Sequence, residues 1–357
     1  VNTEKNVDKL CSLRIYLANY YYLKGDFRKA YSMFKKIEQL IKNTEFIYLK
    51  TLIYYSLANC NYYICDFQKA RNFYKLSLVY SSRRKRGERY YKPTILMCLG
   101  IIESSLGNFN LARKYIYRAH NLFLKHFGLN YPDTALSFVA MGNISSSFGE
   151  YEKALDYYTK SLQIRISIYG EINYLVAESL WGLGYSYKNL KKYKKAEEYL
   201  KKASEITDMA VGKDSSRLII ILLHLSDVYL LQNKFEETLD TCKYGEKLTV
   251  KYFGKFHLYL IYFYNNLTQL YFKKKKYNLS LKYLQLNEKI LQKIPKPSPN
   301  DVMELYINFA SVYFELKNKI KAKEYYQKAY DIAVKNNIKE REREISTKLR
   351  SLQDTIK

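Results

Sequence analysis

The sequence predicts an all-α fold, an α-solenoid of about eight helix pairs closed by a C-terminal capping helix. Three observations indicate this fold. The chain repeats itself, with one step of 40 residues followed by steps of 42. Its apolar residues follow a helical spacing with no sustained period-2 alternation. Chain breakers are few, with 13 glycines and 5 prolines in 357 residues.

The repeat is anchored by a small residue near the start of the second helix of each unit. Three positions upstream of the anchor stands an aromatic residue, except in the last unit, where Lys319 stands. Twelve positions upstream every residue is small, as at Ala18, Gly142 and Gly184. Helix axes approach to about 8–10 Å only where the contacting side chains are small, so these positions predict two packed helices per unit. The anchors are Ala30, Ala70, Ala112, Ala154, Ala196, Thr238, Ser280 and Ala322.

The eight units are expected to follow one another along an array over residues 1–338. A short turn joins the two helices of each unit, marked by Gly25, Gly107 and Gly149 in three units and by Asn233 in a later one. In order, the units are predicted over approximately 8–45, 48–86, 90–128, 132–170, 174–212, 216–254, 258–294 and 300–336.

Helix boundaries are indicated by proline, which tolerates the first turn of a helix and disrupts its interior. All five prolines are therefore predicted to lie between units. Residues 339–357 predict the capping helix, because a stacked array needs a final helix with a polar outer face. Its apolar face is expected to hold Ile345, Leu349, Leu352 and Ile356. The prolines are Pro93, Pro132, Pro295, Pro297 and Pro299.

The order of small residue, aromatic residue and Ala-x3-aromatic resembles the tetratricopeptide repeat over roughly residues 8–357. It is visible as Gly142, Tyr151, Ala154 and Tyr158. The family's early tryptophan and closing proline are absent, and Trp181 stands one place from the expected position. The order appears again as Ala18, Tyr21, Phe27, Ala30 and Phe34.

The 42-residue period is similar to that of the kinesin light chain and nephrocystin-like subgroup, in which the second helix is extended. Gly128, Gly170, Gly212 and Gly254 keep the period, and "NYPDTA" at 130–135 matches the subgroup's Pro-Asp-x-Ala start once. The resemblance implies a right-handed superhelix whose first helices line a concave groove and whose second helices form the outside. It also implies a non-enzymatic scaffold or adaptor that binds a protein or peptide partner.

Composition excludes several classes of protein. The 60 basic and 34 acidic residues give a net charge of +26, which favours an acidic partner, whether protein, anionic membrane or nucleic acid. The 5 cysteines lack CxxC spacing, so reduced thiols are expected. The longest wholly apolar run, 218–223, is far too short for a transmembrane helix. With no signal region at the N-terminus, a cytoplasmic protein is predicted.

No pattern indicates catalysis. The four histidines (His120, His126, His224 and His257) occupy unrelated repeat positions without metal-ligand spacing, and no phosphate-binding or nucleophile motif is present. We therefore expect no enzymatic activity, no cofactor and no metal site.

The predicted binding site lies on the first helices. Ranges 51–64 and 134–148 contain no charged residue, which also follows from packing on both sides of these helices. Asparagine offers a donor and an acceptor to a peptide backbone, and tyrosine and tryptophan offer contact area. A partner segment is therefore expected to contact a predicted groove made of Asn19, Tyr22, Asn59, Tyr62, Asn143, Trp181, Tyr185, Lys188, Asn265 and Gln269.

Lysines gather in the turns of the later units and predict a basic ridge, because equivalent turns align along one edge of a solenoid. The ridge is expected to hold an acidic partner; a nucleic-acid-binding accessory protein is the second hypothesis and a peptide-sensing regulator the third. A further basic run, "RRKR" at 83–86, is interpreted as a connector or a localisation element. The ridge comprises Lys191, Lys192, Lys194, Lys195, Lys234, Lys273, Lys274, Lys275, Lys276, Lys317, Lys319 and Lys321.

Overall fold

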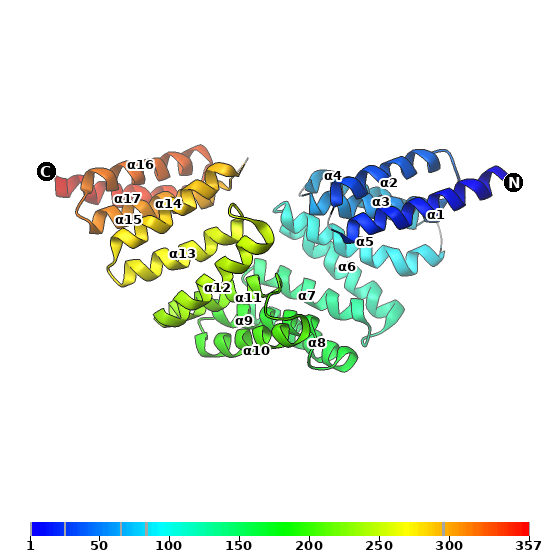
Figure 1. The fold of residues 1–357 in the computed structure, drawn as a ribbon, viewed down its shortest axis with the longest axis horizontal. Helices are drawn as coiled ribbons and strands as arrows, with labels where there is room; N and C mark the ends of the chain where they lie inside the picture. The colour runs from blue at the N-terminus through cyan, green and yellow to red at the C-terminus, as the bar shows by residue number, and fades with distance from the viewer. Residues whose placement is uncertain (1, 25, 65, 83–84, 295–296, 357) are drawn as a thin grey trace. The chain divides into compact units, whose positions relative to one another are not determined.

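The computed structural model describes residues 2–24, 26–64, 66–82, 85–294 and 297–356, and within them it contains 17 α-helices and no strand (Figure 1). The all-α prediction is therefore confirmed. The chain divides into two compact units, an N-terminal body, Val1–Glu171, and a C-terminal body, Ile172–Lys357. Gly25, Cys65, Pro295 and the pair 83–84 of the basic run lie outside the described residues.

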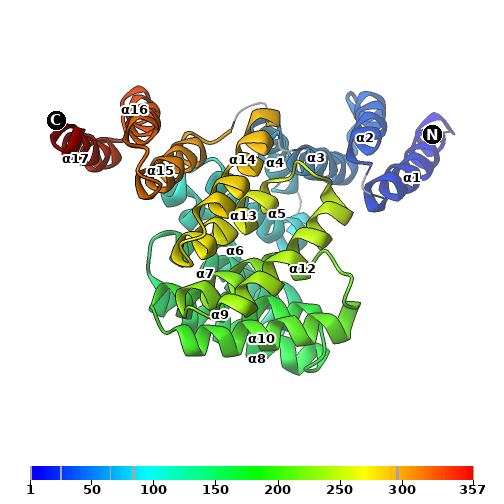
Figure 2. The ribbon, with the colours of Figure 1, turned by 60° about the vertical axis from the view of Figure 1, so that its left-hand side comes forward.

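The N-terminal body is a stack of helix pairs in which each helix packs on the next one along the chain (Figure 2). Its helices are α1 (Asn2–Leu23), α2 (Phe27–Ile41), α3 (Ile47–Tyr63), α4 (Phe67–Ser81), α5 (Lys85–Ser105), α6 (Phe109–Phe127), α7 (Pro132–Ser147) and α8 (Tyr151–Tyr169).

The C-terminal body follows the same rule, and each of its helices packs on the helix that follows it. The helices are α9 (Tyr174–Asn189), α10 (Tyr193–Val211), α11 (Leu218–Leu231), α12 (Phe235–Phe253), α13 (Leu258–Lys273), α14 (Tyr277–Lys293), α15 (Pro299–Glu315), α16 (Lys319–Lys335) and α17 (Lys339–Ile356).

The small residues of the repeat lie where the two helices of a pair touch. A Cβ atom added to Gly142 would lie 2.7 Å from the ring of Tyr158, and one added to Gly184 would lie 2.6 Å from Leu200. The residues at the anchor positions, such as Ala154 and Ala196, are fully buried. Close approach of the helices therefore explains why these positions carry small residues.

Two kinds of turn end the helices. Between units, Gly170 and Gly212 adopt φ of 77° and 87° with extended ψ, a conformation that is essentially restricted to glycine. Within pairs, the left-handed residue recurs every 42 positions, at Gly107, Gly149, Lys191, Asn233, Lys275 and Lys317. The predicted glycine and asparagine turns are confirmed at the described positions, but the lysines were not expected to be left-handed.

The left-handed lysines carry strain that glycine would remove. Lys191 has φ 59°, and a left-handed residue with a Cβ costs roughly 1–2 kcal/mol. Lys191→Gly is expected to raise the free energy of unfolding by up to about 1 kcal/mol, because glycine's larger unfolded-state entropy offsets part of the gain. The control Lys195→Gly, inside α10, should lower it by about 1 kcal/mol. Urea unfolding measures both changes. If both variants lost the same free energy of unfolding, Lys191 would not be a strained position.

One proline prediction is wrong. Pro93 lies inside α5, eight residues after its first residue Lys85, instead of between units. The helix therefore continues through a residue that lacks a backbone N–H, and Pro93 is buried in the body. Pro132 and Pro299 do stand in the first turn of α7 and α15, as predicted.

The last helix closes the C-terminal body. Ile345, Leu349 and Leu352 of α17 are buried in a cluster with Tyr326 and Ala329 of α16. The side chain of Ile356 lies outside the described residues. Among residues 339–352 of α17, whose side chains the structure describes, the exposed ones, such as Arg343 and Arg350, are polar.

Candidate functional site

In the N-terminal body the predicted groove residues divide into exposed and packed ones. Asn19 and Asn143 are exposed, whereas Asn59 is half-buried. The side-chain oxygen of Asn143 accepts a hydrogen bond of 2.6 Å from the hydroxyl of Tyr158, in the second helix of its own pair. Tyr74 donates to Asn59 in the same way. Each of these two asparagine oxygens therefore joins the first helix of its pair to the second, α3 to α4 and α7 to α8.

The tyrosines of this body pack against rings. Tyr22 lies 5.4 Å from Phe27 and 5.7 Å from Tyr63, measured between ring centroids. Tyr62 lies 5.9 Å from Phe67. Burial raises the pKa of Tyr22 well above its ordinary range. Both side chains are partly buried and pack against the core of this body.

In the C-terminal body, helices α9 and α11 bring three predicted residues together around one that was not predicted. The rings of Trp181 and Tyr185 lie 5.7 Å and 5.1 Å from the ring of His224. Lys188 lies at the same place, with Nζ 3.3 Å from Nδ1 of His224. The result is an aromatic and cationic surface on two adjacent first helices.

Asp227 holds this surface in place. It accepts a hydrogen bond of 2.8 Å from Nζ of Lys188 and one of 2.7 Å from Nδ2 of Asn266, in α13. Burial alone raises the pKa of this carboxyl, but the hydrogen bond with His224 and the charge of Lys188 outweigh it and lower the pKa to about 2. Burial lowers the pKa of His224. Asp227 thus links three successive first helices, through its ion pair with Lys188 of α9 and its hydrogen bond from Asn266 of α13.

These shifts make stability depend on pH in one direction. Asp227 is protonated near pH 3.8 in the unfolded chain but only near 2 in the folded one, so the unfolded state binds more protons as the pH falls. The pair is expected to contribute about 2 kcal/mol that is lost between pH 4 and 2. The lowered pKa of His224 acts in the same sense below about pH 6.5. Asp227→Asn should flatten the fall below pH 4 in urea titrations, whereas Asp156→Asn, on the exposed face of α8, should not.

A pocket opens beside Trp181. It has a volume of about 190 Å³ and lies between α9, α10 and the start of α11. The guanidinium of Arg217 stacks 3.8 Å above the ring centroid of Tyr174. The indole Nε1 of Trp181 is shielded from solvent and has no acceptor among the described residues. Its lining, called here the Trp181 pocket, is Tyr174, Glu178, Trp181, Thr207, Arg217, Ile220 and Ile221.

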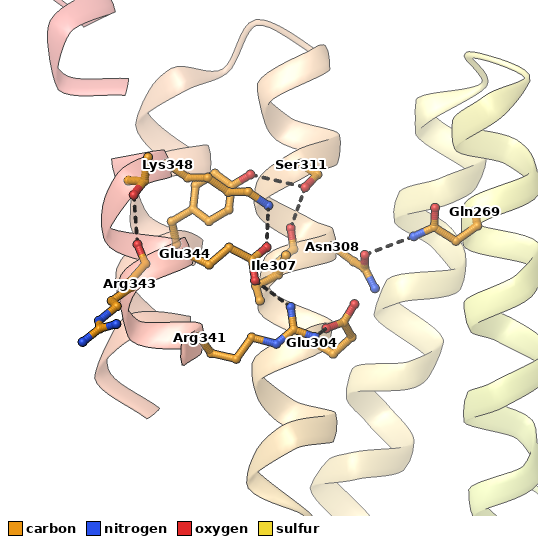
Figure 3. Close-up of polar contacts among 11 residues, drawn as sticks. Gln269, Glu304, Ile307, Asn308, Ser311, Arg341, Arg343, Glu344 and Lys348 are labelled. Carbon is orange, nitrogen blue, oxygen red and sulfur yellow. Dashed lines mark hydrogen bonds and ion pairs between the residues drawn. The ribbon is translucent and has the colours of Figure 1, made fainter. Parts of the chain in front are cut away.

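The polar contacts continue along the first helices towards the C-terminus (Figure 3). Gln269 of α13 donates a hydrogen bond of 3.2 Å to Asn308 of α15, and Arg341 of α17 pairs with Glu304 at 3.4 Å. Asn265 accepts a hydrogen bond of 2.7 Å from Asn287 in α14. The two predicted residues of α13 lie four residues apart, on the same side of the helix, yet they contact different helices.

The basic ridge is partly neutralised. Nζ of Lys234 lies 2.6 Å from Glu197 of α10, and Nζ of Lys274 lies 3.2 Å from Glu236 of α12, so carboxylates near the start of one second helix meet lysines in the turn of the next pair. Lys273 donates to Asn233, and Lys319 is half-buried. The remaining lysines are exposed: Lys191, Lys192, Lys194, Lys195, Lys275, Lys276, Lys317 and Lys321.

Sequence reasoning missed residues that the repeat itself could have found. His224, Asn266 and Asn308 stand at one repeat position, 42 residues apart, and all contact polar residues of neighbouring first helices. The predicted residue, Asn265, stands one place earlier and contacts Asn287 of α14. Nothing in the repeat pattern indicated Arg217, because the position of its side chain depends on stacking with Tyr174, which lies 43 residues earlier in the chain.

The described part of the chain shows neither a metal-binding group nor a membrane span. No three His, Cys, Asp or Glu side chains gather there in an arrangement suited to a metal ion. Its helices all fall short of the combined length and apolarity that crossing a bilayer requires.

Comparison with known proteins identifies the kind of repeat in the chain. Models of the tetratricopeptide repeat match residues 91–167, 175–241 and 304–336. The apo form of the quorum sensor NprR from B. thuringiensis is similar in structure, with a TM-score of 0.70 and 15% identity over 90% of this chain and 87% of that one. By sequence, no curated protein matches significantly.

Two further solved structures share the fold. A Rap protein complexed with Competence and Sporulation Factor has a TM-score of 0.61 at 14% identity, covering 93% of this chain and 99% of that one. A tetratricopeptide repeat protein from Parabacteroides merdae has a TM-score of 0.53 at 18% identity, covering 83% and 99%. At these identities the likeness concerns the fold alone.

Proposed function

Because the chain is a tetratricopeptide-repeat protein, we propose that it is a non-enzymatic scaffold that holds a segment of a partner protein on the first helices of its C-terminal body. The observation that carries this proposal is the Trp181 pocket, which adjoins the surface formed by Tyr185, Lys188 and His224. A concave apolar site with a few convergent polar groups is the usual form of a binding site.

The chemistry of the pocket favours a particular kind of segment. Ile220, Ile221 and Tyr174 offer apolar area for one aliphatic or aromatic side chain. Arg217, held by its stack on Tyr174, offers a planar donor pair for a carboxylate. Trp181 lines the same pocket and adds part of its indole ring to the apolar contact area. The proposed ligand is an extended segment with an apolar residue next to an acidic one.

The charge network gives the surface a fixed shape before binding. Lys188, Asp227 and Asn266 bond to one another across α9, α11 and α13, so their side chains are already ordered. A preorganised surface loses less conformational entropy when a ligand binds. Since Lys188 is neutralised by Asp227, we assign recognition of acidic groups to Arg217 and not to Lys188.

A pull-down with mass spectrometry at moderate salt identifies the partner, and variants of the bait locate the site. Arg217→Ala and Trp181→Phe are expected to weaken capture about tenfold each, the loss of one good hydrogen bond or contact. Arg118→Ala, an exposed arginine of α6 with the same charge change, is the control and should capture normally. Equal capture by all three variants would contradict the site.

The exposed lysines of the basic ridge support a second proposal, an acidic partner that docks along the turns. Glu197 and Glu236 stand between these lysines and weaken the attraction for a phosphate backbone, so we rank nucleic acid below acidic protein. Filter binding at low salt tests this ranking, because phosphate contacts produce steep salt dependence. A peptide-sensing regulator is the third proposal, supported by the quorum sensor and the factor-bound Rap protein among the structural neighbours.

A further inference from the structure

His224 contacts an ammonium and a carboxylate through a single ring nitrogen. Its Nδ1 atom lies 3.3 Å from Nζ of Lys188 and 3.5 Å from Oδ2 of Asp227, and that Nζ lies 2.8 Å from the same oxygen. The ring packs against Trp181 and Tyr185, at 5.7 Å and 5.1 Å between centroids. We name the three polar groups, Lys188, His224 and Asp227, the His224 triangle.

In the arrangement that the structure shows, the imidazole of His224 is neutral. An ammonium only donates hydrogen bonds, so the contact with Nζ of Lys188 makes Nδ1 the acceptor and places the ring proton on Nε2. Lys188 then donates both to His224 and to Asp227. The charges of Lys188 and Asp227 balance, and the His224 triangle carries no net charge.

A proton on Nδ1 requires a different arrangement of the same groups. Nδ1 becomes a donor, and the acceptor within reach is Oδ2 of Asp227. Lys188 loses one of its two acceptors and faces a second cation 3.3 Å away, which repels it. Lys188 is the group that moves, because it has a flexible four-carbon stem and its side chain is already 15% exposed, whereas the imidazole is packed against two rings.

The first helices around His224 supply few charges. From α9 the facing side chains are Lys188 and Tyr185, and from α13 the uncharged Asn266 donates to Asp227. The hydrogen bond from His224 and the charge of Lys188 outweigh burial and hold the pKa of Asp227 at about 2, so this carboxylate stays ionised at any pH above about 4.

The second helices that pack on α11 do not change this balance. Cys242 of α12 faces Asp227, but burial raises the pKa of its thiol to about 12. Glu197 of α10 accepts a hydrogen bond of 2.9 Å from Gln232, after the end of α11. Among the described members of the His224 triangle, His224 is therefore the group that changes its charge in weakly acidic solution.

We propose that His224 makes the partner-binding surface pH-sensitive: when its ring takes up a proton, Lys188 leaves the triangle and becomes a recognition group, in addition to Arg217, for acidic residues of the bound segment. This inference rests on the function proposed above and adds regulation to the same site. One carboxylate, one ammonium and one imidazolium give the protonated triangle a net charge of +1.

Protonation and binding are then coupled in both directions. An acidic segment that pairs with Lys188 favours the protonated ring, so binding takes up a proton and the affinity rises as the pH falls. We expect a gain of about 5- to 10-fold between about pH 8 and 5, the lower end of typical coupling between two sites. A glutamate of the segment keeps most of its charge in this range, because its ordinary pKa is about 4.3. Folding stability moves in the opposite direction, because burial lowers the pKa of His224 and its protonation therefore destabilises the fold.

The first test needs no ligand, because Trp181 is the single tryptophan of the chain and its ring lies beside His224. A protonated imidazole quenches a neighbouring indole more strongly than a neutral one, so the tryptophan emission of the full chain should fall in one step below about pH 6.5. His224→Gln should remove this step, whereas the matched control His126→Gln, in α6, should keep it. Emission that stays flat down to about pH 5 while circular dichroism shows a folded chain, or a step that survives in His224→Gln, would overturn the proposal.

The second test measures regulation of binding by calorimetry with a peptide from the captured partner, at about pH 8 and 5 and in two buffers of different ionisation enthalpy. The wild-type chain should bind about 5- to 10-fold more tightly at the lower pH and take up a proton, and His126→Gln should behave alike. His224→Gln should bind with the same affinity at both pH values. The double variant Lys188→Gln with Asp227→Asn, which leaves no unpaired charge, should lose most of the gain while its emission step remains.

The outcomes separate this proposal from the proposed function. A wild-type affinity that is equal at both pH values, or a gain that persists in His224→Gln, would overturn the pH regulation and leave the binding site in place. A peptide that binds at neither pH would refute the proposed function, and the emission step with its loss in His224→Gln would then decide the protonation of His224 by itself.

Discussion

Replacing Gly245 by alanine is expected to lower the free energy of unfolding by about 1–3 kcal/mol, against the usual gain for this change inside a helix. The Cβ atom would lie 2.1 Å from Cζ of Phe263. Phe263 is fully buried in the core of the C-terminal body, so its ring cannot turn away into solvent. Urea unfolding of the chain measures the change.

A second substitution shows whether the contact itself is responsible. Phe263→Leu alone should destabilise the body by leaving a cavity, but in combination with Gly245→Ala the two losses should add to less than their sum. Lys243→Ala, exposed two residues from Gly245, is the control and should change stability by no more than about 0.5 kcal/mol. Strict additivity of the pair would show that the contact between α12 and α13 has been misread.

Removal of Asp227 is the second large effect. Asp227→Ala leaves the ammonium of Lys188, whose side chain is 15% exposed, without its carboxylate, and it removes one of the two acceptors of Asn266, which keeps its hydrogen bond to Ser226. A broken buried pair costs about 3–5 kcal/mol, and the partial exposure of both groups places the expectation at about 2–3 kcal/mol.

The double variant Asp227→Leu with Lys188→Met should be more stable than Asp227→Ala, because no charge is then left unpaired. Asp156→Ala, which removes the exposed partner of Lys160, is the control with an expected change below about 0.5 kcal/mol. If Asp227→Ala proves as mild as Asp156→Ala, the network across α9, α11 and α13 does not hold the first helices together.

The repeat made the fold predictable because its constraints are steric. Gly142 and Gly184 must be small for two helices to touch, and this requirement returns every 42 residues. The place of Pro93 was not predictable in the same way, because a helix tolerates a proline when the surrounding packing compensates for one lost hydrogen bond. The left-handed backbone of the turn lysines was not predictable for a similar reason. The packing of the two helices in a pair imposes this turn conformation on whichever residue occupies the position.

The site was predicted less well than the fold, because a helix face changes with a single residue. Successive residues point about 100° apart, so choosing Asn265 instead of Asn266 moved the prediction from the inter-unit network to the contact with α14. The structure brings Trp181, Tyr185 and Lys188 together on one surface, but the partners of Lys188, His224 and Asp227, lie 36 to 39 residues away along the chain. The Trp181 pocket was not predictable because its lining comes from α9, α10 and the start of α11, which meet only in the folded chain.

The account rests most on the claim that a partner segment occupies the Trp181 pocket. Trp181 is the single tryptophan of the chain, so its intrinsic fluorescence reports on this site alone. Titration with a peptide from the captured partner is expected to shift the emission saturably, and Arg217→Ala should move the midpoint about tenfold higher. A peptide that binds by calorimetry and leaves the emission unchanged would contradict the claim.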